Sequence, residues 1–440
     1  MQVVLQNTSE MKIENSRSGI NVIEFSAPAV KEKGFWALNW LRFVLAAYLV
    51  LFHTLRIYYP SIENSWVTSV LSLGNMATSV FFVLSGFLLT HAYVVMKNGR
   101  AINRRNFVIA RFSTLYPLHI VGLLLALSPV AVTLFTRGGI PVVVDMMNVQ
   151  TRMLGQWEVA LALFMGFTLL NAWNPFYMVF NGPSWSLSAL GFYYLLFPAA
   201  AAKIYRMKAP KIALVLLCIL FMLPGAVADL LHRTDVFTVG LLHRNPIIRL
   251  PLFLAGIVLC VIFARGPKFA STWQRISASV LIIATVLLAT VLHHRGIDLH
   301  IIQNGLYFPA SLAIIWLCIS TKWLPHSKIR FWGDRLGAAS LPLFLLHVPL
   351  FILFRKAEQV IQVWASTSGG FTSVLTAARE AEQTIFLFPL YLILLIAVCL
   401  VVQERFVTPL QKAIRNSFSD RGRPDASTVV PPRKQATGTC

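Results

Sequence analysis

Two ionisable residues lie in the first long apolar run of the chain, where an ionisable side chain is costly if the run spans a membrane. They are Arg42 and His53. Eleven residues of α-helix make three turns plus about 20°, so the two side chains share one face, about 16 Å apart along the axis. A fixed cation and a distant titratable base suit a ligand that has phosphates at one end and a reactive group at the other. The alternative is an arginine that reaches lipid phosphates and a histidine that is bonded to a neighbouring helix.

More arginines follow around the start of the third apolar run, beside the same cytoplasmic end as Arg42. Arg104 and Arg105 precede the third apolar run, Arg111 lies one turn inside it, and Tyr116 comes soon after. Several guanidinium groups that converge in this way bind phosphate groups well. The alternative is that these arginines anchor the chain to lipid head groups.

Hydroxyl and aromatic side chains mark three further runs. Ser85, followed by a glycine, sits in the middle of the second run and indicates a close approach of two helices. The fourth run opens with Ser184, Trp185, Ser186 and Ser188, which suit a sugar site or a helix cap. Arg249 opens the sixth run, and His347 lies in the middle of the ninth.

Composition decides which class of protein positions these residues. Of the 440 residues, 57% are hydrophobic and only 12% are charged, with a mean hydropathy of +0.68. These values exclude a soluble enzyme, a disordered chain and a fibrous protein. The apolar residues come in long runs rather than alternating, which argues against a β-barrel. The fold class that remains is all-α: a polytopic bundle of transmembrane helices.

We predict ten spans of about 20 apolar residues each, the length that crosses a bilayer. A stretch at 158–172 is a shorter, eleventh candidate. The ten lie at 35–59, 66–96, 107–136, 184–202, 212–231, 246–264, 276–293, 302–320, 336–355 and 383–403.

The net charge of +21 is better explained by membrane orientation than by nucleic-acid binding, since no basic-aromatic module is present. With ten spans, 26 of the 38 Lys and Arg residues fall on one side and 7 in the loops of the other. The positive-inside rule then predicts that both termini are cytoplasmic and that 137–183 is one long external region. The expected organisation is a polar segment at 1–34, a membrane domain at 35–403 and a basic, disordered cytoplasmic tail at 404–440. No cysteine pair has metal-ligand spacing, so no metal is expected.

Taken together, these motifs resemble the membrane-bound acyltransferase 3 family, over about residues 36–403. The matches occur in the order of the family. They are Arg42 with ten residues to His53, Phe-Phe-x-Leu-Ser-Gly-Phe around Ser85, Arg-Arg…Arg…Tyr-Pro from Arg104, Ser-Trp-Ser-Leu-Ser from Ser184, Arg249…Phe253…Gly256, and Leu-Gly…Ser…His-x-Pro-Leu around His347.

The resemblance implies a multi-pass enzyme of the plasma membrane (the bacterial inner membrane). Such an enzyme moves an acyl group, typically acetyl, from cytoplasmic acyl-CoA to a hydroxyl of a surface glycan or its lipid-linked precursor. His53 corresponds to the catalytic histidine and Arg42 to its basic partner. Arg111, with Arg104, Arg105 and Tyr116, would hold the coenzyme. The residues that would serve the acceptor are Ser85, Ser184, Trp185, Ser186, Ser188, Arg249 and His347. Its partners would be acyl-CoA, the glycan acceptor and the lipid bilayer.

Two departures from the family pattern keep alternatives open. The family glutamates that follow Ser-Trp-Ser-Leu-Ser-x and Arg-x-x are Leu190 and Leu252 here, and no acidic residue falls within the core of a predicted span. A histidine base then has to fix its tautomer through a carbonyl, a hydroxyl or a loop carboxylate. A transporter or flippase, or a catalytically inactive membrane scaffold, remains possible on the sequence alone. Direct transfer and an acyl-histidine relay are both compatible with His53.

Overall fold

The computed structural model describes residues 35–63, 65–145, 150–266, 270–321, 323, 325–364, 377 and 386–420. This part of the chain is almost entirely helical and contains 10 helices that are long and apolar enough to cross a membrane. Those spans are Trp36–Tyr58, Trp66–Val95, Arg104–Arg137, Gly182–Tyr205, Pro210–Leu230, Val236–Arg265, Thr272–His294, Ile302–Ile319, Ser340–Trp364 and Phe388–Phe418.

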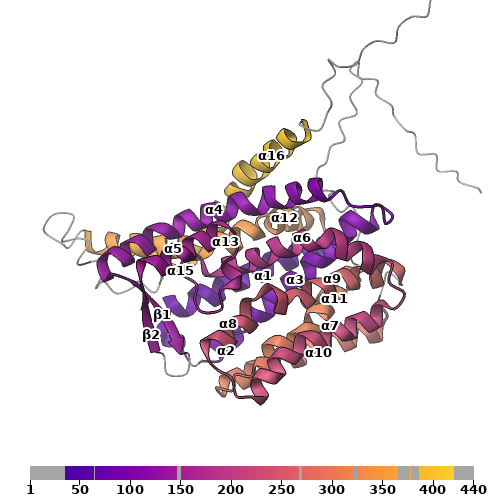
Figure 1. Ribbon diagram of the computed structural model, residues 1–440, viewed down its shortest axis with the longest axis horizontal. Coiled ribbons are helices and arrows are strands. Elements are labelled where there is room, and N and C mark those ends of the chain that lie inside the picture. Colours follow the sequence, from indigo (N-terminus) through magenta and orange to yellow (C-terminus); the bar gives the residue numbers. More distant parts are fainter. Residues whose placement is uncertain are drawn as a thin grey trace, which may run out of the picture. The chain divides into compact units, whose positions relative to one another are not determined.

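Several spans consist of more than one element, because short kinks and π-helical turns interrupt them. The long helices run side by side (Figure 1). The α-helices are α1 Trp36–Tyr58, α2 Trp66–Leu71, α3 Gly74–Thr90, α4 Arg104–Arg137, α5 Gln156–Phe167, α6 Trp185–Tyr205, α7 Pro210–Leu230, α8 Val236–Arg244, α9 Pro246–Arg265, α10 Thr272–His294, α11 Tyr307–Ile319, α12 Ser327–Ala338, α13 Ser340–Trp364, α15 Phe388–Val401 and α16 Thr408–Asp420.

The all-α bundle and the ten spans are confirmed, and each predicted span overlaps one of those found. The eleventh candidate forms α5, which has 12 residues and is too short to cross a bilayer. That both termini are cytoplasmic stays a prediction. The N-terminal segment 1–34 lies outside the described residues, as does the tail beyond Asp420.

Helices α3 and α9 pack backbone to backbone near the centre of the fold. A Cβ atom built on Gly86 would lie 2.1 Å from the carbonyl oxygen of Phe253, and one on Gly256 would lie 2.0 Å from that of Val83. Only glycine allows such an approach. The close helix contact that the glycine after Ser85 predicted is therefore present, and it fixes α3 against α9.

The segment between α4 and α6 contains the only strands found in the described residues. Strands β1 (Ile140–Asp145) and β2 (Gln150–Leu154) form an antiparallel hairpin at one end of the bundle (Figure 1). Arg152 of β2 pairs with Glu158 of α5 at 2.8 Å, and this contact lowers the pKa of the Glu158 carboxyl. The long connection is thus a folded unit rather than a simple linker.

The expectation of disorder is wrong for the first part of the C-terminal tail. A π-helical turn, Val402–Val407, leads into α16. Ile414 and Phe418 of α16 line an apolar groove together with residues of α4, and Arg335 of α12 pairs with Glu404 at 2.7 Å. The apolar residues of α16 recur at helical spacing between charged residues, and average composition does not reveal this pattern.

A buried acidic residue, Glu358, lies in the ninth span, beyond the end at residue 355 that the sequence predicts. Two charged residues, Arg355 and Lys356, stand where the predicted ninth span ends. Helix α13 continues to Trp364 and carries Glu358, which is 4% exposed and accepts a hydrogen bond from the Tyr58 hydroxyl at 3.0 Å. The apolar run therefore ends at these charged residues, whereas helix α13 continues to Trp364.

Candidate active site

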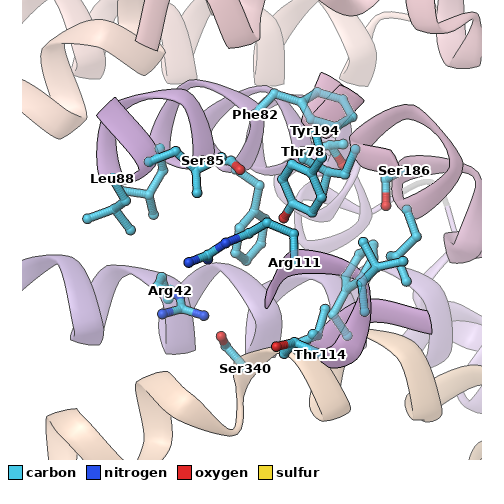
Figure 2. Close-up of a pocket in the computed structure, with 18 residues that line it drawn as sticks. Arg42, Thr78, Phe82, Ser85, Leu88, Arg111, Thr114, Ser186, Tyr194 and Ser340 are labelled. Atoms are coloured by element: carbon cyan, nitrogen blue, oxygen red, sulfur yellow. The ribbon is translucent and has the colours of Figure 1, made fainter. Parts of the chain in front are cut away.

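A cavity of about 220 Å³ opens between α1, α3, α4, α6 and α13 (Figure 2). Eighteen residues line it, and none of them carries a carboxylate. Its polar lining residues are Arg42, Thr78, Ser85, Arg111, Thr114, Ser186, Tyr194 and Ser340. The structure therefore brings together Arg42, Ser85, Arg111 and Ser186, four residues singled out from the sequence.

Two guanidinium groups dominate the cavity. Arg111 donates to the Tyr93 hydroxyl at 2.7 Å and lies over the Tyr93 ring, 5.0 Å from its centroid. Arg42 forms no ion pair with any residue that the structure describes, and it is close enough to Arg111 for the two charges to repel. Figure 2 shows both heads facing the same space. Two guanidinium groups with no carboxylate among the lining residues have the chemistry to bind an anion such as a phosphate.

The hydroxyl groups around these arginines are held mostly by the backbone. Ser340 donates to the carbonyl oxygen of Gly337 at 2.7 Å, and Ser186 donates to that of Pro183 at 3.0 Å. Their oxygen lone pairs remain able to accept hydrogen bonds from a ligand. Tyr194, which the sequence analysis did not single out, also lines the cavity, next to Ser85.

The second polar group is a pair of histidines from α1 and α13. His347 is fully buried, and its Nε2 lies 3.0 Å from Nδ1 of His53. His347 Nδ1 lies 3.2 Å from the carbonyl oxygen of Leu343, and His53 Nδ1 lies 2.8 Å from that of Leu49. The sequence placed these histidines 294 residues apart and gave no sign that they meet.

These contacts determine which nitrogen of each neutral ring carries its hydrogen. A carbonyl oxygen only accepts, so His347 is protonated on Nδ1 and its Nε2 accepts. His53 Nδ1 faces two acceptors, Leu49 O and His347 Nε2, and is therefore the donor. The lone pair of His53 then lies on Nε2. Its tautomer is fixed without a carboxylate, by a carbonyl and a second histidine.

The histidine pair lies next to the cavity but does not line it. Phe344 lines the cavity, and its ring centroid is 6.2 Å from that of His347. On α1, Arg42 is eleven residues before His53, about 16 Å along the helix. One face of α1 thus presents Arg42 to the cavity near one end of the helix and His53, with its free Nε2, toward the other end.

Other predicted site residues lie elsewhere. Arg104 and Arg105 are exposed at the start of α4. Tyr116 donates to the carbonyl oxygen of Phe167 at 3.1 Å and lines the apolar groove on the opposite side of α4. Ser184 and Ser188 donate to the carbonyl oxygens of Asn181 and Leu169. These hydroxyls tie the start of α6 to the segment before it, and neither caps the helix, because Ser184 at the N-cap accepts no hydrogen bond from a first-turn amide.

Trp185 packs against a third histidine that the sequence analysis missed. The ring centroids of Trp185 and His243 are 4.8 Å apart, and His243 lies close enough to His53 to interact with it electrostatically. His243 precedes Arg244 in the last turn of α8, a helix of nine residues that lies before the sixth span predicted at 246–264.

Arg249 is almost fully buried at 1% exposure. Its Nε donates to the carbonyl oxygen of His243 at 2.9 Å, and its guanidinium lies 5.6 Å from the centroid of the Phe221 ring. Both terminal nitrogens lack a hydrogen-bond partner among the described residues. One helical turn further on lies the buried Leu252, at the position where the resemblance to the family implies a glutamate.

Comparison with known proteins identifies the family. A family model described as an acyltransferase domain matches residues 35–404. The chain belongs to the acyltransferase 3 family. The match covers the first nine spans and the tenth as far as residue 404, and it makes the protein a membrane acyltransferase.

Curated relatives agree with membership of the acyltransferase 3 family. Protein 2 in the picA locus of Rhizobium radiobacter is 31% identical over 159 residues, which are 35% of this chain and 75% of that protein. An uncharacterised Haemophilus influenzae protein is 24% identical over 261 residues, 56% of this chain and 96% of the relative. Acyltransferase MdmB of Streptomyces mycarofaciens is 27% identical over 229 residues, 48% of this chain and 53% of MdmB. No solved structure is significantly similar to the chain.

Proposed function

We propose that this protein is an O-acyltransferase of the bacterial inner membrane. It takes an acyl group, typically acetyl, from acyl-CoA and transfers it to a hydroxyl of a surface glycan or its lipid-linked precursor. The observation that carries the proposal is the free Nε2 of His53, which His347 and Leu49 fix on the helix face that also carries Arg42. A base and a phosphate-binding cavity are what acyl transfer from a coenzyme thioester requires.

The cavity fits the anionic part of the donor substrate. Arg42 and Arg111 offer charge-assisted hydrogen bonds to phosphate oxygens, and Ser85, Ser340 and Tyr194 offer neutral ones. No lining carboxylate would repel the phosphates. A donor anchored here would extend its thioester arm past Phe344 toward the two histidines.

His53 would act as the general base. Its Nε2 takes the proton of the acceptor hydroxyl while the hydroxyl oxygen attacks the thioester carbonyl carbon. The carbon–sulfur bond then breaks, and the leaving thiolate takes the proton from the imidazolium. His347 Nε2, which accepts from His53 Nδ1, stabilises the imidazolium while it exists. A positioned base of this kind contributes roughly 10²–10⁴ to the rate.

A variant of this mechanism uses His53 as a nucleophile. Nε2 would attack the thioester to form an acyl-histidine, and the acceptor hydroxyl would resolve it. Both routes use the same lone pair and the same donor cavity. Acid-quenched protein that has reacted with labelled acyl-CoA would carry label on His53 only in the second route.

The proposal is tested by the binding of acetyl-CoA to the full-length protein in nanodiscs. We expect Arg42→Ala to weaken binding at least tenfold and His53→Ala to leave it within twofold of wild type, since His53 does not line the cavity. Arg104→Ala, which removes an exposed arginine outside the cavity, is the matched control. Absence of binding by the wild-type protein would overturn the proposal and would favour a catalytically inactive scaffold.

A further inference from the structure

A serine, a histidine and an aspartate form a hydrogen-bonded series at one end of the bundle, outside the site described above. Ser72 Oγ lies 2.7 Å from His293 Nε2, and His293 Nδ1 lies 3.1 Å from Asp298 Oδ1. Ser72 caps the C-terminal end of α2, His293 is in the last turn of α10, and Asp298 follows α10. We infer that Ser72 is an activated nucleophile in a second acyl-transfer site, which takes short-chain acyl esters from the aqueous side.

The hydrogen-bond directions are those that nucleophilic catalysis requires. A carboxylate only accepts, so His293 carries its hydrogen on Nδ1, toward Asp298. Its Nε2 lone pair then faces the Ser72 hydroxyl and can take the hydroxyl proton. The carbonyl oxygen of Thr68, 2.8 Å from Ser72 Oγ, is an alternative acceptor for the same hydrogen. Nucleophile, base and orienting carboxylate thus occur in the order of a serine-hydrolase triad.

Packing on both sides holds Ser72 and His293 in register. Leu73, next to Ser72, is buried in a cluster with Ala289 of α10, and Leu292, next to His293, packs against the same cluster. The Tyr48 hydroxyl lies 2.6 Å from the carbonyl oxygen of Val70 at the end of α2. A site that is supported from two elements in this way keeps its reacting atoms at a fixed distance.

Backbone donors for a developing oxyanion lie just beyond the serine. Helix α3 begins at Gly74, so the amides of Gly74 and Asn75 lie in its first turn. Helix N-terminal amides stabilise negative charge. These two groups are two and three residues from Ser72, and we assign to them the stabilisation of the tetrahedral intermediate.

Exposure defines the class of substrate. The side chains of His293 and Asp298 are 36% and 71% exposed, so the site is open to water and small esters reach it. Water also screens the Asp298 charge, so the carboxylate should contribute less than a buried one does. The residues lie at the same end of the bundle as the C-terminus of α1, the side that the positive-inside rule makes external.

The reaction balances without a further reagent. The Oγ atom of Ser72 bonds to the ester carbonyl carbon, its proton passes to His293 Nε2, and the carbon–oxygen bond to the alcohol breaks as that proton protonates the leaving alkoxide. A second hydroxyl, from water or an alcohol, then attacks the acyl-serine. Its proton passes through His293 back to Ser72 Oγ, which restores the free enzyme.

The neighbouring pair Ser69 and His294 is a built-in control. Ser69 Oγ lies 3.2 Å from His294 Nδ1, and His294 stacks on Trp66 with ring centroids 3.7 Å apart. In the described part of the chain no carboxylate contacts His294. Ser69 thus has a histidine but no orienting acid, and it should not be activated.

The test is covalent labelling of the full-length protein in nanodiscs with a biotinylated fluorophosphonate, followed by peptide mapping. We expect label on Ser72, none in Ser72→Ala, at least tenfold slower labelling in His293→Gln, and normal labelling in Ser69→Ala. Asp298→Asn changes an exposed side chain, so it should fold, and it should slow labelling severalfold. A wild-type protein that is not labelled at Ser72, or equal labelling of His293→Gln, would overturn the inference.

A second measurement separates this site from the proposed function, which it does not require. The same preparation should hydrolyse 4-nitrophenyl acetate, with the activity lost in Ser72→Ala and unchanged in His53→Ala. Acetyl-CoA binding should be unchanged in Ser72→Ala. Loss of ester hydrolysis in His53→Ala with full activity in Ser72→Ala would assign the esterase activity to the histidine pair and contradict a role for Ser72.

Discussion

Nε2 of His347 lies 3.0 Å from Nδ1 of His53 and fixes which nitrogen of His53 is free. His347→Ala should lower the rate of acyl transfer between tenfold and a hundredfold. That loss is smaller than the loss of the base itself, because Leu49 O still accepts from His53 Nδ1. The KM for acyl-CoA should not change, because His347 does not line the cavity. Steady-state kinetics measure kcat and the KM for acyl-CoA separately. Tyr391→Phe is the control for packing around His347, because the Tyr391 hydroxyl donates to the His347 carbonyl oxygen. An unchanged kcat in His347→Ala would contradict a positioning role.

Arg111 should matter to donor binding far more than the arginines just before it. A charge-assisted hydrogen bond is worth about 1.5–3 kcal/mol, so Arg111→Ala should raise the Kd for acetyl-CoA about tenfold to a hundredfold. Calorimetric titration in nanodiscs measures this. Arg105→Ala, on the exposed start of the same helix, should change the Kd less than threefold. Equal effects of the two substitutions would mean that general surface charge, not the cavity, attracts the donor.

The contact between α3 and α9 should not tolerate one added methyl group. Gly86→Ala places Cβ against the carbonyl oxygen of Phe253, and separating the helices should cost about 1–3 kcal/mol. We expect a lower melting temperature in a fluorescence-detected thermal scan. Gly155→Ala is the matched control, because nothing lies within 4 Å of its Cβ position. A Gly86→Ala protein as stable as this control would mean that the helices are not packed this closely.

The terminal nitrogens of Arg249 have no hydrogen-bond partner among the described residues, so we expect a buried glutamate to be tolerated one turn away. Leu252→Glu places a carboxylate one turn from Arg249, and the two can pair, so the melting temperature should stay close to that of wild type. The same substitution in an Arg249→Met background leaves the carboxylate alone and should cost about 3–5 kcal/mol. Leu259→Glu, on the same helix, should behave like the double variant. If Leu252→Glu unfolds the protein whether or not Arg249 is present, the two side chains do not meet.

Hydropathy and charge were sufficient to predict the spans, because a bilayer imposes length and composition on every helix that crosses it. The exceptions have local causes. The predicted ninth span stops at the charged pair Arg355 and Lys356, so it leaves out the rest of α13, including Glu358. The apolar residues of α16 are spaced among charges, and average composition reads such a segment as disordered.

The site was only partly predictable, because its contacts join residues far apart in the chain. Periodicity on α1 placed Arg42 and His53 on one face, but the approach of His347 to His53 depends on how α13 packs against α1. Motif order grouped Ser184, Ser186 and Ser188, yet of these three only Ser186 faces the cavity with the arginines. Ser72, His293 and Asp298 come from three segments, and no sequence spacing links them.

Single-turnover release of coenzyme A tests the central claim most directly. Wild-type protein and His53→Ala, each saturated with acetyl-CoA in membranes from cells that produce the protein and its acceptor, are compared for the rate at which free thiol appears. We predict that His53→Ala binds acetyl-CoA as wild type does and releases coenzyme A at least a hundredfold more slowly. Release at the wild-type rate by a correctly inserted His53→Ala protein would contradict the assignment of His53 as the catalytic base or nucleophile.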